Sequence, residues 1–281
     1  MEKQLLDPEQ IQHVEENTLN IPLSEEEALG PTLPEHHHHM SKETRHKVDV
    51  RKWLADNWKD PALKVSTTFN LSSIIRYNTY TEKKDFLSQL RDHLLSCLVD
   101  SEDDDDGSFS NKDHLSLTLV NNWIYRHKVL QVNYTTYNMR HAQDSLNLRT
   151  HGDIMVLSRD GNGAHPYWYG HIIGIFHSMV VHTGPKSRLW EPMKMKFLFV
   201  RWFGLDTEDS ERGGWKAKKL HQIGFVEGNA VFGFVDPSDV IRAIHLIPRF
   251  SQGCTKDSLG HSIARSILEK DEDWVRYYIN M

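Results

Sequence analysis

The second half of the chain alternates apolar and polar residues, and this period of two limits the fold more than any other pattern. The alternating residues are Leu115, Leu117 and Leu119, and then Leu130, Val132 and Tyr134. Short segments rich in Ile, Val, Phe, Trp and Tyr follow at 153–157, 168–176, 196–202, 219–225, 231–234 and 240–247. Turn-forming residues such as Gly161-Asn162-Gly163 separate these segments. Several short strands without a helical period between them predict a mainly β domain, as a barrel or a sandwich.

Helical patterns precede this region. Phe86, Leu90 and Leu94 recur every four residues within 80–99, and Thr79 with Glu82 forms a potential capping box. We therefore expect a helix at 80–99, and a shorter one at 46–62 that ends at Asp60-Pro61. Residues 46–110 should form short helices and an acidic loop, in which Asp103–Asp106 lack the spacing of a calcium loop.

The first 45 residues are predicted to be a disordered acidic arm. Large apolar residues are few there, so the entropy of ordering the chain is not compensated. The arm contains the tract His36–His39, for which a solvated low-complexity run is a better interpretation than a metal site. Residues 1–148 carry a net charge of −8 and residues 149–250 a net charge of +3, counted without histidine.

Cysteine use and hydropathy indicate an intracellular protein, in the nucleus or the cytoplasm. Cys97 and Cys254 are the two cysteines, which is too few for a disulfide framework or a four-cysteine zinc site. The N-terminus is polar and acidic, unlike a signal peptide, and no apolar run is long enough to cross a membrane. The sequence thus indicates neither a membrane partner nor a small-molecule cofactor.

Long ordered blocks resemble the C-terminal region of an uncharacterised family of basidiomycete (mushroom-forming) fungi, some of whose members are fused to or derived from Plavaka-type transposases. The blocks are residues 121–158, 165–177, 197–204, 213–226 and 232–250, and the similarity spans roughly residues 85–281. The catalytic domain of such transposases is ribonuclease-H-like, and nothing in this sequence is similar to it. The resemblance implies an accessory region, with residues 251–281 as a C-terminal extension that ends before the relatives do, as in a truncated gene product.

Residues 150–250 also resemble, more faintly, the bromo-adjacent homology (BAH) domain, a chromatin-reading β-barrel. The matching segments are Gly152–Val156, His165–Phe176, Val200–Phe203 and Val240–Leu246. The proline usual shortly after Arg-Trp-Phe and the cysteine usual in the closing segment are absent. The resemblance implies a small BAH-like β-barrel over residues 111–250, behind the helical segment and the arm.

Aromatic residues of this region are candidate ligand contacts. On a strand, alternation sends Trp168 to one face and Tyr167 and Tyr169 to the other. We expect Trp168 and Trp202 to pack in the core, and Tyr167, Tyr169 and Trp215 to offer an exposed ligand surface, such as a cage for a methylated lysine.

The densest basic cluster predicts the nucleic-acid contacts. It consists of Arg212, Lys216, Lys218 and Lys219. These side chains could neutralise phosphates, but the acidic residues just upstream also allow a solvated hairpin of mixed charge.

Histidines are numerous, and four of them lie close together in the sequence: His165, His171, His177 and His182. Their spacing does not favour one zinc site, so no metal ligand is predicted. No Gly-x-Ser-x-Gly, Walker or dinucleotide-binding pattern occurs, so no catalytic residue is predicted.

These observations predict a non-catalytic binding module of transposon-derived origin, associated with chromatin or nucleic acid, with a protein partner also open. Two alternatives remain: a fragment of a hydrolase or transferase, and a decayed element without a maintained role. The enzyme alternative requires several of His165, His171, His177, His221 and Asp153 to converge.

Overall fold

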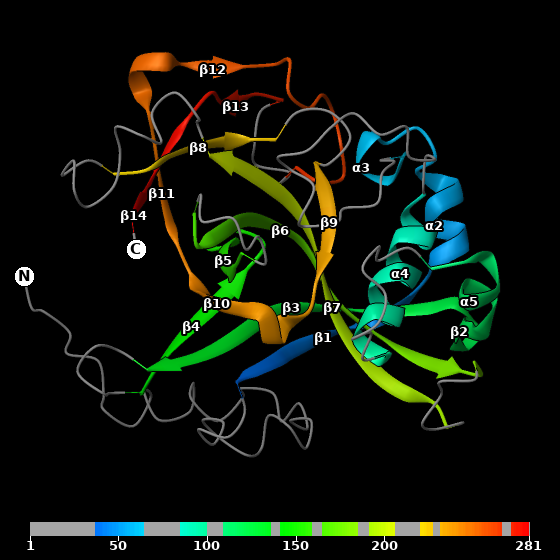
Figure 1. Ribbon diagram of the computed structural model, residues 1–281. Helices are drawn as coiled ribbons and strands as arrows, with labels where there is room; N and C mark the ends of the chain where they lie inside the picture. Colours follow the sequence, from blue (N-terminus) through cyan, green and yellow to red (C-terminus); the bar gives the residue numbers. More distant parts are fainter. Residues whose placement is uncertain are drawn as a thin grey trace, which may run out of the picture. The chain divides into compact units, whose positions relative to one another are not determined.

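Two long neighbouring strands, β6 (Tyr167–His182) and β7 (Met193–Leu205), form the centre of the fold (Figure 1). Their sequences are dominated by β-branched and aromatic residues, which favour extended backbone. They pair antiparallel from Tyr169↔Phe203 to Val180↔Met193, with a bulge between Ile172 and Gly174. The bulge changes the direction of β6, so its two halves face different parts of the core.

This computed structural model describes residues 37–64, 85–99, 109–135, 141–158, 165–184, 191–205, 220–226, 231–265 and 271–280, all within one unit of residues 34–281. The other strands of the main sheet are β1 (His38–Asp49), β2 (Leu117–Leu119), β3 (Trp123–Thr135), β4 (His141–Asn147), β5 (Asp153–Leu157), β8 (Gln222–Phe225), β9 (Phe232–Val235), β10 (Val240–Ala243), β11 (His245–Pro248) and β14 (Tyr277–Asn280). A separate pair consists of β12 (Cys254–Thr255) and β13 (Asp273–Trp274).

The mainly β prediction is confirmed, but the sheet is not closed into a barrel. Its main path of hydrogen-bonded strands runs β1-β3-β6-β7-β8-β14-β11, while β5 pairs with β6 and β10 pairs with β5. Strands β10 and β11 follow each other directly across Ile244 and pair with different strands, β5 and β14. Among the described residues, β10 and β11 are joined by the covalent chain and not by a ladder of hydrogen bonds. The closed barrel predicted for residues 111–250 is therefore wrong.

Three apolar clusters fill the space around the curved sheet. The first packs one face of β6 and β7, through Phe176, Phe197 and Phe199, against the helices. The second lies on the other face of these strands and includes Trp168 and Trp202, whose rings meet edge to face at 6.0 Å. The third takes one buried residue each from β5, β6, β7, β8 and β14, together with one from the β10–β11 junction: Met155, Tyr169, Phe203, Ile223, Ile279 and Ile244. The core positions predicted for Trp168 and Trp202 are confirmed.

The helices are short and lie together on one side of the sheet (Figure 1): α2 (Val50–Asp56), α3 (Pro61–Lys64), α4 (Phe86–Leu98) and α5 (Asn111–Ser116). Single 3-10 turns are η3 (Val120–Asn122), η5 (Pro237–Asp239) and η6 (Phe250–Gln252). Helix α4 buries Phe86, Leu90 and Leu94, as the period of four predicted. It begins later than predicted, because the Asp85 carboxylate accepts a hydrogen bond from the backbone N–H of Ser88 and caps the helix. The predicted cap at Thr79 and the acidic run Asp103–Asp106 lie outside the described residues.

Four other details differ from the sequence predictions. Strand β1 begins at His38, inside the predicted arm, because it pairs with β3 from His38↔Val132 onward. Pro61 begins a helix where it was predicted to end one. Leu115 belongs to α5 and is 78% exposed, so the alternation starts only at Leu117. Strand β14 pairs with β8 and β11, so residues 277–280, predicted to lie in a C-terminal extension, are part of the main sheet.

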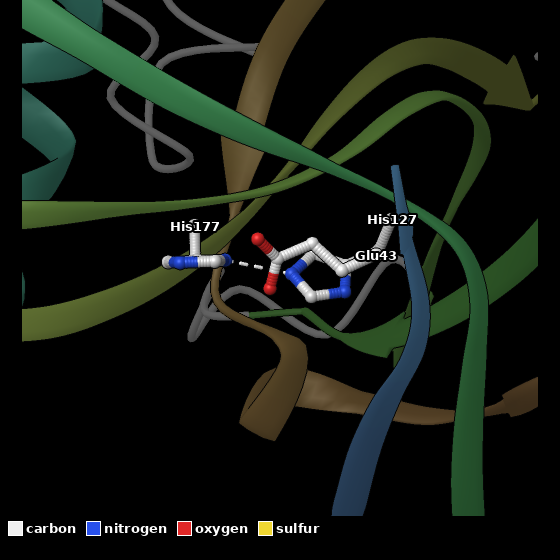
Figure 2. Close-up of side chains that lie close together, drawn as sticks. All are labelled: Glu43, His127 and His177. Atoms are coloured by element: carbon white, nitrogen blue, oxygen red, sulfur yellow. Dashed lines mark hydrogen bonds between the residues drawn. The ribbon is translucent and has the colours of Figure 1, made fainter. Parts of the chain in front are cut away.

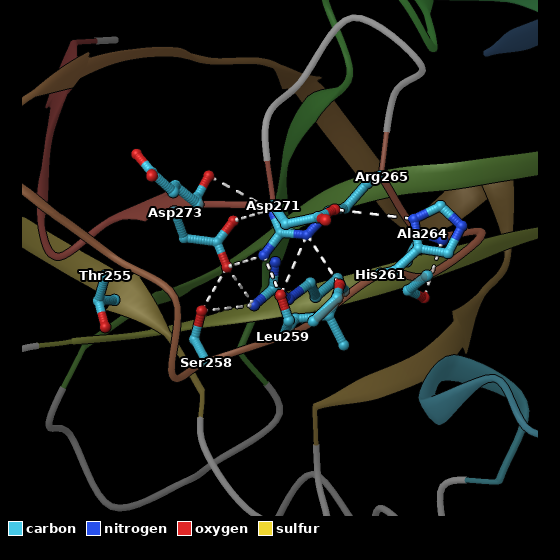
Figure 3. Close-up of polar contacts among 12 residues, drawn as sticks. Thr255, Ser258, Leu259, His261, Ala264, Arg265, Asp271 and Asp273 are labelled. Carbon is cyan, nitrogen blue, oxygen red and sulfur yellow. Dashed lines mark hydrogen bonds and ion pairs between the residues drawn. The ribbon is translucent and has the colours of Figure 1, made fainter.

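A buried ionic network ties the C-terminal segment to β7 (Figure 3). Asp273 accepts a hydrogen bond of 2.9 Å from Arg201 and two, of 2.8 and 2.9 Å, from Arg265. The hydroxyl of Ser258 donates to the same carboxylate, and the Arg265 guanidinium also donates to the carbonyl of Leu259. All three charged side chains are 8% exposed or less.

Within the described residues, no helix is long and apolar enough to span a membrane.

Candidate binding face

A row of four cross-strand partners joins β1, β3, β6 and β7. Lys47 lies opposite Tyr125, Tyr125 opposite His177, and His177 opposite Lys196. Directly opposed residues of antiparallel strands share one face of the sheet. Trp123 and Lys194 lie two residues from Tyr125 and Lys196 along their strands, so they share that face. We call Lys47, Trp123, Tyr125, His177, Lys194 and Lys196 the basic–aromatic face.

The reverse side of the same strands is apolar and covered. Ile124, Phe176 and Phe197 are 0–2% exposed and pack against buried residues of α2 and α4. Because this side supplies the core, the sequence is free to place charged and aromatic groups on the other side. Further along the strands the basic–aromatic side itself enters the core, since Ile175 and Leu198 are both 0% exposed.

Aromatic rings and cations of this face contact one another. The Nζ of Lys47 lies 3.9 Å from the ring centroid of Trp123 and 5.9 Å from that of Tyr125. The ring of Tyr125 stacks on His177 at a centroid distance of 4.6 Å and an interplanar angle of 7°. Lys47 and Lys194 are exposed, while Trp123, Tyr125 and Lys196 are half-buried. The face therefore combines flat rings and positive charges within reach of solvent.

The positive charge of this face also governs His177. Burial, together with the charges of Lys194 and Lys196 and the neighbouring His127, lowers the pKa of His177 to about 3. At neutral pH the His177 imidazole is therefore uncharged. The positive charge of the face comes from Lys47, Lys194 and Lys196, and β1 adds two acidic side chains, Asp49 opposite Trp123 and Glu43 opposite His127.

The three aromatic residues predicted to contact a ligand, Tyr167, Tyr169 and Trp215, differ in how far the structure describes and exposes them. Alternation on β6 is confirmed, since Trp168 joins the second cluster and Tyr167 and Tyr169 belong to the third. Tyr169 is 1% exposed, so the prediction that it offers a ligand surface is wrong. The physical reason is that apolar clusters supplied by other strands cover both faces at this end of β6. Tyr167 is half-buried, and Trp215 lies outside the described residues.

The basic cluster Arg212, Lys216, Lys218 and Lys219 also lies outside the described residues. Its part in nucleic-acid binding stays a prediction.

The structure pairs most of the residues named for the enzyme alternative. His171 pairs with Asp153 at 2.7 Å, and the rings of His165 and His221 meet edge to face at 4.8 Å. His177 instead bonds to His127. Within the described part of the chain, Glu43, His127 and His177 are the one group of three His, Cys, Asp or Glu side chains whose ligand atoms lie within 4.8 Å of one another. Four of the five residues named for the enzyme alternative thus lie in two contacting pairs, and that alternative stays a hypothesis.

Sequence reasoning missed the basic–aromatic face. Alternation within 123–127 and 193–197 could have placed Trp123 with Tyr125, and Lys194 with Lys196. It could not have brought the two pairs together, because their register depends on β6, which lies between them and starts at Tyr167, 32 residues after β3 ends at Thr135.

Comparison of the chain with protein-family models, with curated proteins and with solved structures gives no significant match.

Proposed function

We propose that this chain is a non-catalytic nucleic-acid-binding module, and that the basic–aromatic face carries the binding. The observation behind the proposal is the row Lys47–Tyr125–His177–Lys196, which places lysines at both ends of an aromatic platform. Proteins that bind single strands use such lysines for the phosphates and such rings for stacking on the bases. Trp123, under the Lys47 ammonium, extends the platform.

Single-stranded nucleic acid fits this face better than a duplex does. The described part of the face is a sheet surface, and stacking needs bases that are free of their partners. The described helices α2 and α4 pack on the reverse side of these strands, so the face presents strands and not a recognition helix. The transposon-derived origin, the chromatin association and the nuclear location suggested by the sequence remain compatible with such a module and are proposed with it.

The test is the affinity of the full chain for labelled single-stranded DNA, duplex DNA and nucleosomes, measured by fluorescence anisotropy over a series of salt concentrations. We expect single strands to bind most tightly, with log affinity falling linearly with log salt by about 0.7 per phosphate contact. The double variant K194E/K196E should weaken binding at least about tenfold and flatten that slope. W123A should cost about 1–3 kcal/mol of binding free energy, because it removes a stacking ring.

The matched control lies in the turn after α2. Lys59 sits over the ring of Trp58 at 5.0 Å, and Trp58 is 63% exposed, so this pair has the same chemistry outside the face. K59E and W58A should leave affinity within twofold. A third variant, K216E/K218E/K219E, tests the basic cluster predicted from the sequence. Absence of binding to all three probes at low salt would overturn the proposal, and binding to nucleosomes alone would point to a histone partner.

A further inference from the structure

Next to the basic–aromatic face, two buried imidazoles and a carboxylate from three strands come together (Figure 2). The Nε2 of His127 on β3 lies 2.7 Å from the Nδ1 of His177 on β6. Glu43 on β1 is the cross-strand partner of His127, and its carboxylate completes a group whose ligand atoms lie within 4.8 Å of one another. His127 is 3% exposed and His177 is 5% exposed, whereas Glu43 is exposed.

We infer that this group is a binding site for a divalent transition-metal ion of the zinc type, with His127 Nε2, His177 Nδ1 and a Glu43 carboxylate oxygen as ligands. Two imidazole nitrogens and one carboxylate are a donor set that suits zinc, cobalt or nickel, while magnesium and calcium prefer oxygen ligands throughout. Three protein ligands leave a coordination position for water or another ligand. This inference goes beyond the proposed function, with which it shares His177, and its readout is metal binding alone.

The geometry needs only a small adjustment to accept the ion. Two nitrogens at about 2.0–2.1 Å from a tetrahedral zinc lie roughly 3.3 Å apart, against 2.7 Å between His127 and His177. The two nitrogens must therefore separate by about 0.6 Å, and both rings must rotate about their side-chain torsions so that the lone pairs point to the ion. Stacking on Tyr125 holds the plane of His177, and Glu43 marks the exposed side from which an ion can enter.

Metal binding changes the position of one proton in the pair of His127 and His177. In the hydrogen bond between two neutral imidazoles, one bridging nitrogen carries the proton and the other accepts it. A metal ion takes both bridging lone pairs, so the donating ring adopts its other tautomer, with its proton on its far nitrogen. No net proton is released. The charges of Lys194 and Lys196 oppose binding of a cation, and the carboxylate of Glu43 offsets part of that opposition.

The experiment uses the full chain with H36Q and H37Q, so that the histidine tract contributes less to metal binding. After treatment with chelator and its removal, Co²⁺ is titrated and its visible absorption recorded, and Zn²⁺ affinity is measured by calorimetry. We expect one equivalent with the absorption of a four- or five-coordinate Co²⁺ site. H177Q and H127Q should abolish that absorption. E43Q should weaken affinity at least about tenfold, as expected when a ligand is lost.

Two controls keep the outcome decisive. H171Q removes another histidine of β6, the one that pairs with Asp153, and E191Q removes an exposed carboxylate ahead of β7. Both should bind Co²⁺ as the parent does. If the buried variants fail to fold by circular dichroism, E43Q decides the question, because Glu43 is exposed. The inference is overturned if the parent shows no saturable equivalent, or if E43Q binds as tightly as E191Q.

Discussion

Arg201 on β7 donates a hydrogen bond of 2.9 Å to Asp273, a residue 72 positions further along the chain. The same carboxylate accepts hydrogen bonds from both terminal nitrogens of Arg265. One buried anion is therefore paired with two guanidinium groups. The contact fixes the segment before β14, whose Tyr277 meets Phe203 and Phe225 edge to face. The C-terminal segment is thus bound to the centre of the sheet by charge as well as by strand pairing.

Replacing Asp273 should strongly destabilise the fold. D273N leaves two buried guanidiniums without their counter-charge, and breaking a buried pair in this way costs about 3–5 kcal/mol. The measurement is the free energy of unfolding in urea. The control is E272Q, which removes the neighbouring, more exposed pair of Glu272 with Lys256 at 3.3 Å and should cost less than about 1 kcal/mol. Equal effects of the two variants would contradict the role of the network.

The same network should make the fold sensitive to acid. Burial raises the pKa of Asp273, but the hydrogen bonds from Arg201, Arg265 and Ser258 outweigh it and hold the pKa below its ordinary value. A lowered pKa in the folded state means that the unfolded chain binds more protons below about pH 4. This contribution is therefore complete above pH 4 and is lost as the pH falls further. Between pH 5 and pH 3 the parent should lose more unfolding free energy than D273N does; parallel losses would count against this assignment.

Removing the hydroxyl of Tyr169 should not destabilise the protein. In the described part of the chain this buried hydroxyl has no hydrogen-bond partner, and an unsatisfied buried polar group is costly. Y169F keeps the ring in the third cluster and should raise the free energy of unfolding by about 1 kcal/mol. Thermal and urea unfolding provide the measurement. A loss of stability instead would mean that the hydroxyl is bonded in solution.

A methyl group at Gly233 should disturb the second cluster. A Cβ built at this glycine would lie 2.6 Å from the Nε1 of Trp202, whose side chain is buried. G233A should therefore cost about 1–3 kcal/mol through overpacking. G260A is the matched control, because within the described residues a Cβ there meets nothing closer than 4 Å, and it should stay within about 0.5 kcal/mol. Unfolding midpoints that match would refute the close packing of Gly233 on Trp202.

Local sequence patterns predicted the helices and strands better than they predicted which segments those helices and strands pack against. The period of four in 86–94 placed α4, because an apolar stripe must pack whatever covers it. The residue at which α4 begins was harder to predict. Thr79 and Asp85 are both acceptable N-cap residues, and the sequence pattern alone does not choose between them. The alternation at 167–169 sorted Trp168 from its tyrosine neighbours correctly, but it could not show that both faces are buried.

The sequence by itself determined that the chain is mainly β, because residues spaced by two fall on one face of a strand and apolar faces must be buried. Only the tertiary structure decided which strands meet. The partner of His177 is His127, 50 residues earlier, rather than one of the histidines nearby in sequence. That the sheet stays open was decided in the same way, by the change of partner strand at Ile244, from β5 for β10 to β14 for β11. Register and curvature arise from contacts between distant segments, and a local pattern does not contain them.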